Sequence, residues 1–363
     1  MRVLFISRAT LLTAPGGDTV QIRNTADALK DLGVQVDIKL TNEKIDYSLY
    51  DLLHFFNVIR PADILGHIRR SKKPFVVTPI FVDYKEFDSF QRKGIVRLLY
   101  KLSGSSHTVE YIKVIARYIF NNEKINSLEF LIKGQKKSIQ YILRNAKVLL
   151  PNSNSEYNRL LAAFSVNNRF VVVPNAIDPE KFSADDNSKF SPADRTDVIT
   201  IARFEGLKNQ HQIINALNDT KYNVKLIGKA SPNQKGYLEL CKKMAASNIE
   251  FIHHMEQDKL FAFYRRAKVH VLPSWFETTG LSSLEAAAMG CNVVISDKGD
   301  QKEYFKHYAF YCDPASPESI AEQVEKAFIT QPDPEFQQYV LQNYTWKKTA
   351  ERTLEAYNLA LQG

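Results

Sequence analysis

Two glutamates in the stretch FETTGLSSLEAAAMG, Glu277 and Glu285, have a spacing that could serve chemistry. An expected strand, VHVLPS, ends just before Glu277, and a helix of small residues is expected after Gly280. The helix dipole and the free backbone N–H groups of residues 279 to 282 would form a site for an anion or a hydroxyl. Carboxylates repel phosphate but accept hydrogen bonds from sugar hydroxyls. The alternative is that these acidic residues only compensate the helix dipole.

A second pattern, IARFEGLKNQH, places Arg203 at the end of an expected strand and Lys208 at the start of a helix. Two cations beside a helix N-terminus suit a diphosphate, onto which the arginine can form paired hydrogen bonds. Cations on loops are frequent, so this pair gains weight only beside the glutamate pattern.

A third pattern, TAPGGDTVQ, puts Gly16 and Gly17 between the first expected strand and a helix, where the backbone could approach a ligand. A simple turn is the alternative. The chain has neither a GxGxxG sequence nor a GxxxxGK[ST] sequence, which argues against a dinucleotide dehydrogenase and a P-loop enzyme. The histidines are scattered and no Asp-x-Asp pair occurs, so no metal site and no metal cofactor are expected.

The elements that must position these residues alternate along the whole chain. Strands separated by helices of ten to fifteen residues indicate parallel sheets with helices on both faces. Residues 178–197 are polar and contain two prolines, which indicates an interdomain linker. We therefore expect an α/β protein with two doubly wound domains, residues 1–180 completed by a C-terminal helix at 345–363, and residues 190–344.

Composition limits the class of protein. The chain has 363 residues, more than one core usually fills, and no apolar run long enough to span a membrane. Its three cysteines are scattered and odd in number, which favours a reducing compartment and excludes a disulfide framework. The expectation is a cytoplasmic, two-domain protein.

The net charge of +8 is concentrated between Arg92 and Lys147, where twelve lysines and arginines face three glutamates. Apolar residues recur there at helical spacing, as in GIVRLLYKL. Solvated helix faces are one interpretation. A basic amphipathic surface that meets anionic lipid is the other, and would place the protein peripherally on the inner face of the plasma membrane. No nucleic-acid-binding motif accompanies the charge, so nucleic acid is not an expected partner.

Taken together, these motifs resemble glycosyltransferase family 4. The resemblance rests on the E-x7-E spacing of Glu277 and Glu285 around Gly280 and Leu281, on Arg203 with Lys208, on the Gly16–Gly17 loop, and on VVPNAID (172–178) and VLPSWFE (271–277). It covers essentially the whole chain and is most specific between residues 199 and 314. It implies a GT-B fold, with two Rossmann-like domains facing a central cleft, and a retaining, metal-independent enzyme.

The resemblance also implies roles for individual residues. Glu285 would bind the ribose of a nucleotide-sugar donor linked to UDP, GDP or dTDP, and Glu277 would bind the donor sugar. The backbone of Thr279, Gly280 and Leu281 would contact sugar and phosphate. Arg203 and Lys208 would neutralise the departing diphosphate, because fixed cations must meet that charge where no metal does. Gly16 and Gly17 would close over it from the other domain.

One departure affects the acceptor side. Many family members carry a donor-contacting histidine after a strand of the first domain, where this chain reads VVTPIFVDYKEF. Asp83 or Tyr84 could take a related place, or no residue does. His54 could line the acceptor site, although a buried, satisfied histidine is an equal alternative there. We expect transfer of a sugar to a saccharide or lipid-linked acceptor of a surface polysaccharide such as O-antigen or capsule. The alternative is a sugar-nucleotide epimerase or a catalytically silent nucleotide-sugar-binding protein.

Overall fold

A computed structural model describes residues 1–83, 111, 128–183, 194–231 and 234–362. The chain divides into two compact units, one of Met1–Asn175 with Trp346–Gly363 and one of Ala176–Thr345. The first division falls a few residues before the expected end of the first domain at residue 180. The expected linker at 178–197 contains a short helix at its start, and most of the rest lies outside the described residues.

The first unit is built on a parallel sheet whose strands run in the order β2-β1-β3-β4. The strands are β1 (Arg2–Ser7), β2 (Gln35–Leu40), β3 (Leu52–Phe56) and β4 (Phe75–Thr78). The helices are α1 (Gly17–Asp31), α2 (Pro61–Ser71), α6 (Leu128–Asn145), α7 (Asn154–Phe164) and α16 (Trp346–Leu361), with a 3-10 turn η1 (Tyr47–Leu49). These elements alternate as the sequence predicts.

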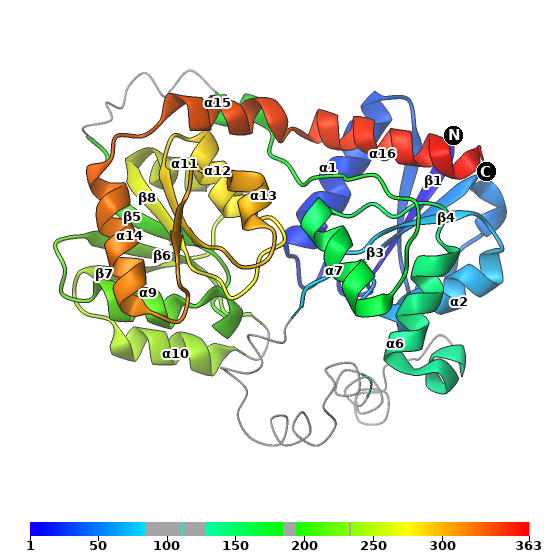
Figure 1. The fold of residues 1–363 in the computed structure, drawn as a ribbon, viewed down its shortest axis with the longest axis horizontal. Coiled ribbons are helices and arrows are strands. Elements are labelled where there is room, and N and C mark those ends of the chain that lie inside the picture. The colour runs from blue at the N-terminus through cyan, green and yellow to red at the C-terminus, as the bar shows by residue number, and fades with distance from the viewer. Residues whose placement is uncertain (84–110, 112–127, 184–193, 232–233, 363) are drawn as a thin grey trace. The chain divides into compact units, whose positions relative to one another are not determined.

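Helices cover both faces of this sheet, as Figure 1 shows. One core joins the sheet to α2, α6 and α7, and the other joins it to α1 and α16. The C-terminal helix α16 packs directly against α1, so the two ends of the chain share one core. Every residue of β3 and β4 is buried, which explains why these strands read as continuous apolar runs.

The apolar runs KVLLPNS (147–153) and RFVVVPNAI (169–177) predict two further strands, but these segments pair only through isolated bridges. Leu149 bridges Val77 on one side and Phe170 on the other, both in parallel. The backbone pairing is real, since Leu150 N donates to Val77 O at 2.7 Å and Val171 N donates to Leu149 O at 2.9 Å. Proline lacks the N–H that a ladder needs, and Pro151 ends the first of these segments. The prediction of full strands here was therefore wrong.

The second unit contains a six-stranded parallel sheet in the order β10-β9-β8-β5-β6-β7. The strands are β5 (Asp197–Ile201), β6 (Asn223–Gly228), β7 (Ile249–His253), β8 (Ala267–Leu272), β9 (Asn292–Ser296) and β10 (Phe310–Cys312). The helices are α8 (Pro179–Ser183), α9 (Gln210–Leu217), α10 (Lys235–Met244), α11 (Gln257–Arg266), α12 (Leu281–Ala288), α13 (Gln301–Phe305), α14 (Pro317–Ile329) and α15 (Pro334–Asn343), with a 3-10 turn η4 (Gly206–Lys208).

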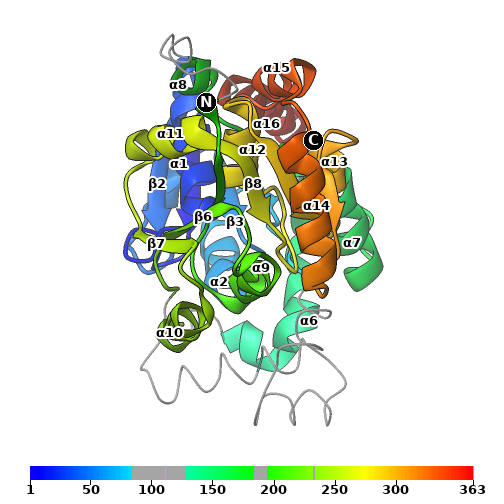
Figure 2. The same ribbon diagram turned by 90° about the vertical axis from the view of Figure 1, so that its left-hand side faces the viewer.

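This sheet is also covered on both faces. One core contains side chains of α11, α12, α13 and α15, and the other contains side chains of α9, α10 and α14. Figure 2 faces this unit and shows α9, α10 and α14 in front of the viewer. The parallel strands all end at one edge, and ligands of open α/β sheets bind at that edge. The loops that follow β5 and β8 are therefore the first place to look for a site.

Candidate active site

Two loops meet where the adjacent strands β5 and β8 end. Trp275 N, in the loop after β8, donates to Leu207 O, in the loop after β5, at 2.9 Å. Asn209 fixes the same junction, because its side-chain amide donates to the carbonyl oxygens of Pro273 at 3.0 Å and Pro314 at 2.7 Å. Asn209 is buried and has a φ of 64°, a conformation that asparagine tolerates better than most residues.

This junction brings Lys208 and Glu277 together. The Lys208 ammonium donates to Glu277 Oε1, and Ser274 Oγ donates to the same oxygen at 2.7 Å. Both side chains are largely buried, with 17% of Lys208 and 9% of Glu277 exposed. Charge-assisted hydrogen bonds of this kind fix two groups more firmly than neutral ones do. The structure thus joins two of the predicted site residues directly, and it adds Ser274, which the sequence did not single out.

Glycine at position 299 is needed for Glu277 to lie where it does. Residues 277 and 299 form a parallel bridge, and Asp300 N donates to Glu277 O at 2.8 Å. A Cβ atom at position 299 would lie 2.1 Å from Glu277 O, and Gly299 has a φ of 76°. Only glycine meets both conditions. Its place in the turn after β9 was the available signal, and the sequence analysis missed it.

The predicted backbone site lies at the start of α12. Gly280 precedes the helix with a φ of 76°, and no side chain caps it. Its carbonyl accepts from the N–H groups of Ser283 at 2.9 Å and Leu284 at 3.0 Å, which begins the helical bonding. Thr279 is buried and Leu281 is half-buried. An uncapped helix N-terminus offers N–H groups and a positive dipole end to an anion or a hydroxyl.

Glu285 lies in the second turn of α12 and is held by two residues of α11. Tyr264 Oη donates to Glu285 Oε2 at 2.7 Å, and Gln257 Nε2 donates to Glu285 Oε1 at 2.5 Å. Burial raises the pKa of Glu285, and these two hydrogen bonds act in the opposite direction. Neither partner was predicted, because nothing in the sequence of α11 marks it as facing α12.

Arg203 follows β5 and is oriented through its backbone and its side chain. Gln210 Nε2 donates to Arg203 O at 2.8 Å, and the guanidinium lies 3.4 Å from Glu205 Oε1. Glu205 also accepts from Ser231 Oγ at 2.5 Å. The Arg203 side chain is 41% exposed, which is far more than Lys208. Arg203 and Lys208 thus come from the two ends of one loop, with Arg203 the more accessible cation.

The candidates of the first unit are less informative. Gly16 and Gly17 stand at the start of α1, where Gly16 N donates to Thr19 Oγ1 at 3.1 Å. Arg8 fixes the preceding loop by an ion pair with Asp18 at 2.6 Å. Asp83 is half-buried and is the last described residue before a gap.

His54 is fully enclosed in the first unit. One ring nitrogen lies 2.7 Å from Tyr357 Oη on α16, and the other lies 2.8 Å from Thr78 Oγ1 on β4. Burial lowers the pKa of His54 to about 3, so the ring is neutral. This is the buried, satisfied histidine that the sequence left open as an alternative to an acceptor residue.

A metal-binding cluster and a membrane-spanning helix were looked for in the described part of the chain. There, no three His, Cys, Asp or Glu side chains gather closely enough to hold a metal ion. No helix among these same residues is long and apolar enough to cross a membrane.

A comparison with known protein families concerns the second unit. Residues 181–343 match the family model "Glycosyl transferases group 1", and this stretch contains Arg203, Lys208, Glu277 and Glu285. The second unit therefore carries a glycosyl transferases group 1 domain.

Two proteins named as glycosyltransferases align with more of the chain than residues 181–343. The chain is 26% identical over 293 residues to an uncharacterized glycosyltransferase of Methanocaldococcus jannaschii, an alignment that covers 74% of this chain and 72% of the relative. It is 24% identical over 390 residues to a D-inositol 3-phosphate glycosyltransferase of Corynebacterium urealyticum, covering 94% of this chain and 90% of the relative. These relatives support a glycosyltransferase.

The solved structures define the fold. Anabaena HepE in complex with UDP and glucose matches with a TM-score of 0.70 at 15% identity, covering 99% of both chains. With two Rossmann-like units, each on a parallel sheet, the chain has the GT-B fold, and the predicted fold class is confirmed.

Proposed function

We propose that the protein is a retaining, metal-independent glycosyltransferase that moves a sugar from a nucleotide-sugar to a saccharide or lipid-linked acceptor in surface polysaccharide assembly. The observation that carries the proposal is the contact of Lys208 with Glu277 beside the uncapped start of α12. A cation, a carboxylate and the backbone N–H groups at the start of α12 lie at one sheet edge. They match the three chemical parts of a sugar diphosphate: its charge, its hydroxyls and its phosphate oxygens.

Each group has a proposed role. Arg203, Lys208 and the start of α12 stabilise the diphosphate as its negative charge develops. Glu277 accepts hydrogen bonds from hydroxyls of the donor sugar, and Glu285 accepts them from the ribose. In the other unit, Gly16 and Gly17 supply backbone contacts to the donor, and Asp83 is the remaining candidate on the acceptor side.

The donor is proposed to be a UDP-, GDP- or dTDP-linked sugar. UDP is the first nucleotide to test, because the matching Anabaena protein was solved with UDP and glucose. The two relatives are both named as glycosyltransferases. They therefore favour sugar transfer over the two alternatives from the sequence, an epimerase and a silent binding protein. The three cysteines, all free and buried, agree with a reaction in the cytoplasm.

A panel of UDP-, GDP- and dTDP-sugars tests the proposal by thermal shift, with and without excess EDTA. A ligand at 100 times its Kd stabilises the folded state by about 2.7 kcal/mol, so the correct donor should stand out. Hydrolysis of the correct donor, or transfer of its sugar, should continue in EDTA, and the anomeric configuration of the sugar should be retained. Stabilisation by no member of the panel, or activity that EDTA abolishes and Mg²⁺ or Mn²⁺ restores, would contradict the donor site or its independence of metal.

A further inference from the structure

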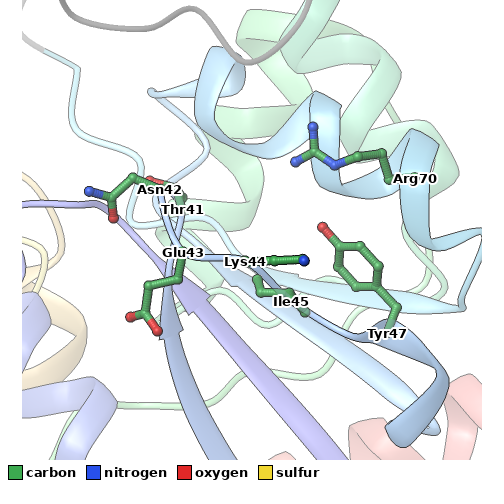
Figure 3. A pocket seen from close by; sticks show the side chains of 7 residues that line it. All are labelled: Thr41, Asn42, Glu43, Lys44, Ile45, Tyr47 and Arg70. Atoms are coloured by element: carbon green, nitrogen blue, oxygen red, sulfur yellow. The ribbon is translucent and has the colours of Figure 1, made fainter.

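A pocket of about 380 Å³ lies in the first unit, at the carboxyl end of the edge strand β2. It is lined by side chains of the loop after β2, of η1 and of the end of α2: Thr41, Asn42, Glu43, Lys44, Ile45, Tyr47 and Arg70 (Figure 3). Small-molecule sites have volumes of about 300–1,000 Å³, so this pocket has room for a molecule of monosaccharide size. None of these residues belongs to the donor site proposed above.

The charge that faces this pocket is positive. Figure 3 shows the Lys44 amine, the Tyr47 hydroxyl and the Arg70 guanidinium directed toward the same space, while the Glu43 carboxylate points away. Glu43 is held in that direction by Lys39 Nζ at 2.9 Å and by the backbone N–H of Leu40 at 3.0 Å. Within the part of the chain that the structure describes, neither Lys44 nor Arg70 forms an ion pair. Two cations are thus available to one anionic group.

The Tyr47 hydroxyl is oriented by a buried histidine behind it. His67 Nε2 lies 3.1 Å from Thr41 O, and because a carbonyl only accepts, Nε2 carries the ring proton. Burial and then the positive charge of Arg70 lower the pKa of His67 to about 4, so the ring is neutral and Nδ1 is an acceptor. Tyr47 Oη therefore donates its proton to Nδ1 over 2.7 Å. Its oxygen lone pairs remain to accept a hydrogen bond from a ligand hydroxyl.

We propose that this pocket binds a sugar or polyol that carries a phosphate group, with the phosphate on Lys44 and Arg70 and a neighbouring hydroxyl donating to Tyr47. Arginine suits phosphate because its planar fork can form two parallel hydrogen bonds, and lysine adds a point charge. The ligand's identity as the acceptor rests on the proposed glycosyltransferase function. Its binding does not, because every residue involved lies in the first unit.

Calorimetric titration of the full-length protein tests the pocket with four probes: glucose 6-phosphate, glycerol 3-phosphate, inorganic phosphate and glucose. The two phosphate esters should bind more tightly than phosphate or glucose, since only they use both halves of the pocket. Lys44→Gln and Arg70→Gln should each weaken the esters by about tenfold or more, as expected for the loss of a charge-assisted contact. Tyr47→Phe should remove the preference for the esters over inorganic phosphate.

Arg69→Gln is the matched control. Arg69 is exposed on α2 beside Arg70 but does not line the pocket, so the ester affinity should be unchanged. Lys44 and Arg70 are both exposed, so their variants should fold, and an unchanged Tm checks this. No detectable ester binding, ester binding that survives both substitutions, or an equal loss in Arg69→Gln would each overturn the proposal.

Two further experiments complete the test. Vesicle binding distinguishes a lipid headgroup from a free metabolite as the source of the phosphate, and a UDP titration distinguishes this pocket from the proposed donor site. Phosphatidylglycerol vesicles that bind wild type and Arg69→Gln, but not Lys44→Gln or Arg70→Gln, would assign the phosphate to a lipid headgroup, whereas binding of the soluble esters alone would assign it to a free metabolite. UDP titrated into the same variants should bind equally well in all of them. Ester binding without any nucleotide binding would support this pocket while refuting the proposed function, and the reverse result would do the opposite.

Discussion

Lys208 connects two loops through its contact with Glu277, so its removal affects both charge and position. Lys208→Ala should weaken binding of the nucleoside diphosphate by about tenfold or more, because a charge-assisted contact is worth about 1.5–3 kcal/mol. Arg203→Ala should have a similar effect on affinity with little effect on stability, since its side chain is 41% exposed. Calorimetry gives both affinities. Lys221→Ala is the control, because Lys221 is an exposed cation just before β6, at the opposite sheet edge. Unchanged affinity in both test variants would remove these cations from the site.

Glu277→Gln keeps the size of the side chain but removes its ion pair with Lys208. We expect kcat to fall by about 100-fold or more while the Kd for the nucleoside diphosphate changes by less than about tenfold, since Glu277 is proposed to contact the sugar. Steady-state kinetics and calorimetry on one preparation separate these quantities. A variant whose nucleotide affinity falls as far as its kcat would show that Glu277 acts only by positioning Lys208.

The ionised carboxylate of Glu285 is buried, and this burial lowers the stability of the folded state. Burial raises the pKa of the Glu285 carboxyl, so this carboxyl binds a proton more tightly in the folded state than in the unfolded state. Its contribution to stability is therefore fully present below the unfolded pKa and is lost as pH rises through the folded pKa. Glu285→Gln should raise the Tm at pH 7, by about 2–4 °C for each 1 kcal/mol recovered, and not at pH 4. Donor affinity should fall in the same variant. A Tm that drops equally at both pH values would show that the carboxylate is structural.

At the scale of elements, the turn after β9 determines where the loop after β8 can lie. Gly299→Ala would place its Cβ within 2.1 Å of Glu277 O, at a φ that also strains alanine. We expect a loss of about 1–3 kcal/mol in stability together with loss of donor binding, as for other changes at special backbone positions. Gly236→Ala is the control, because a Cβ there meets no atom within 4 Å and the residue lies in α10. Urea denaturation of both variants is decisive, and equal stabilities would contradict the proposed role of Gly299.

How far the sequence predicts these elements depends on whether the signal is local. The central strands of the two sheets, such as β3 and β9, are short, buried, mostly apolar runs, so their presence and their parallel arrangement could be predicted. The bridges at Leu149 and Phe170 could not be told from strands, because pairing there depends on the neighbouring β4. Likewise, Glu277 and Glu285 were found by their spacing in one segment. Tyr264 and Gln257 were missed because α11 meets α12 only in the folded chain.

At the scale of the whole molecule, the resemblance is more specific in the second unit than in the first. The group 1 family model covers residues 181–343, all of them in the second unit, and includes no residue of the first unit. There the sequence left His54 open between an acceptor residue and a buried, satisfied histidine. The choice depends on Tyr357, which contacts the ring from α16, 303 residues away. The basic segment expected between Arg92 and Lys147 can be followed only at residues 111 and 128–147, since the rest lies outside the described residues.

The described end of that segment sharpens the prediction of membrane contact. On α6, Lys133 is paired with Glu129 and lies 3.7 Å from the Tyr141 ring centre, whereas Lys136 and Lys137 are exposed. Ile132 is 86% exposed, and a kink at Gly134 separates it from the two lysines. A lipid-facing surface should use the two exposed lysines, each worth about 1 kcal/mol at an anionic membrane, and the apolar side chain.

Sedimentation with anionic vesicles tests this surface at two salt concentrations. The double change Lys136→Gln with Lys137→Gln should weaken binding by about tenfold or more at low salt, and by less at high salt, where charges farther apart than about 8–10 Å are screened. Ile132→Ser should instead remove the part of binding that persists at high salt. Lys72→Gln with Lys73→Gln is the matched control, because it removes another lysine pair from the same unit. If wild type does not sediment at low salt, or if both lysine pairs matter equally, α6 presents only a solvated face.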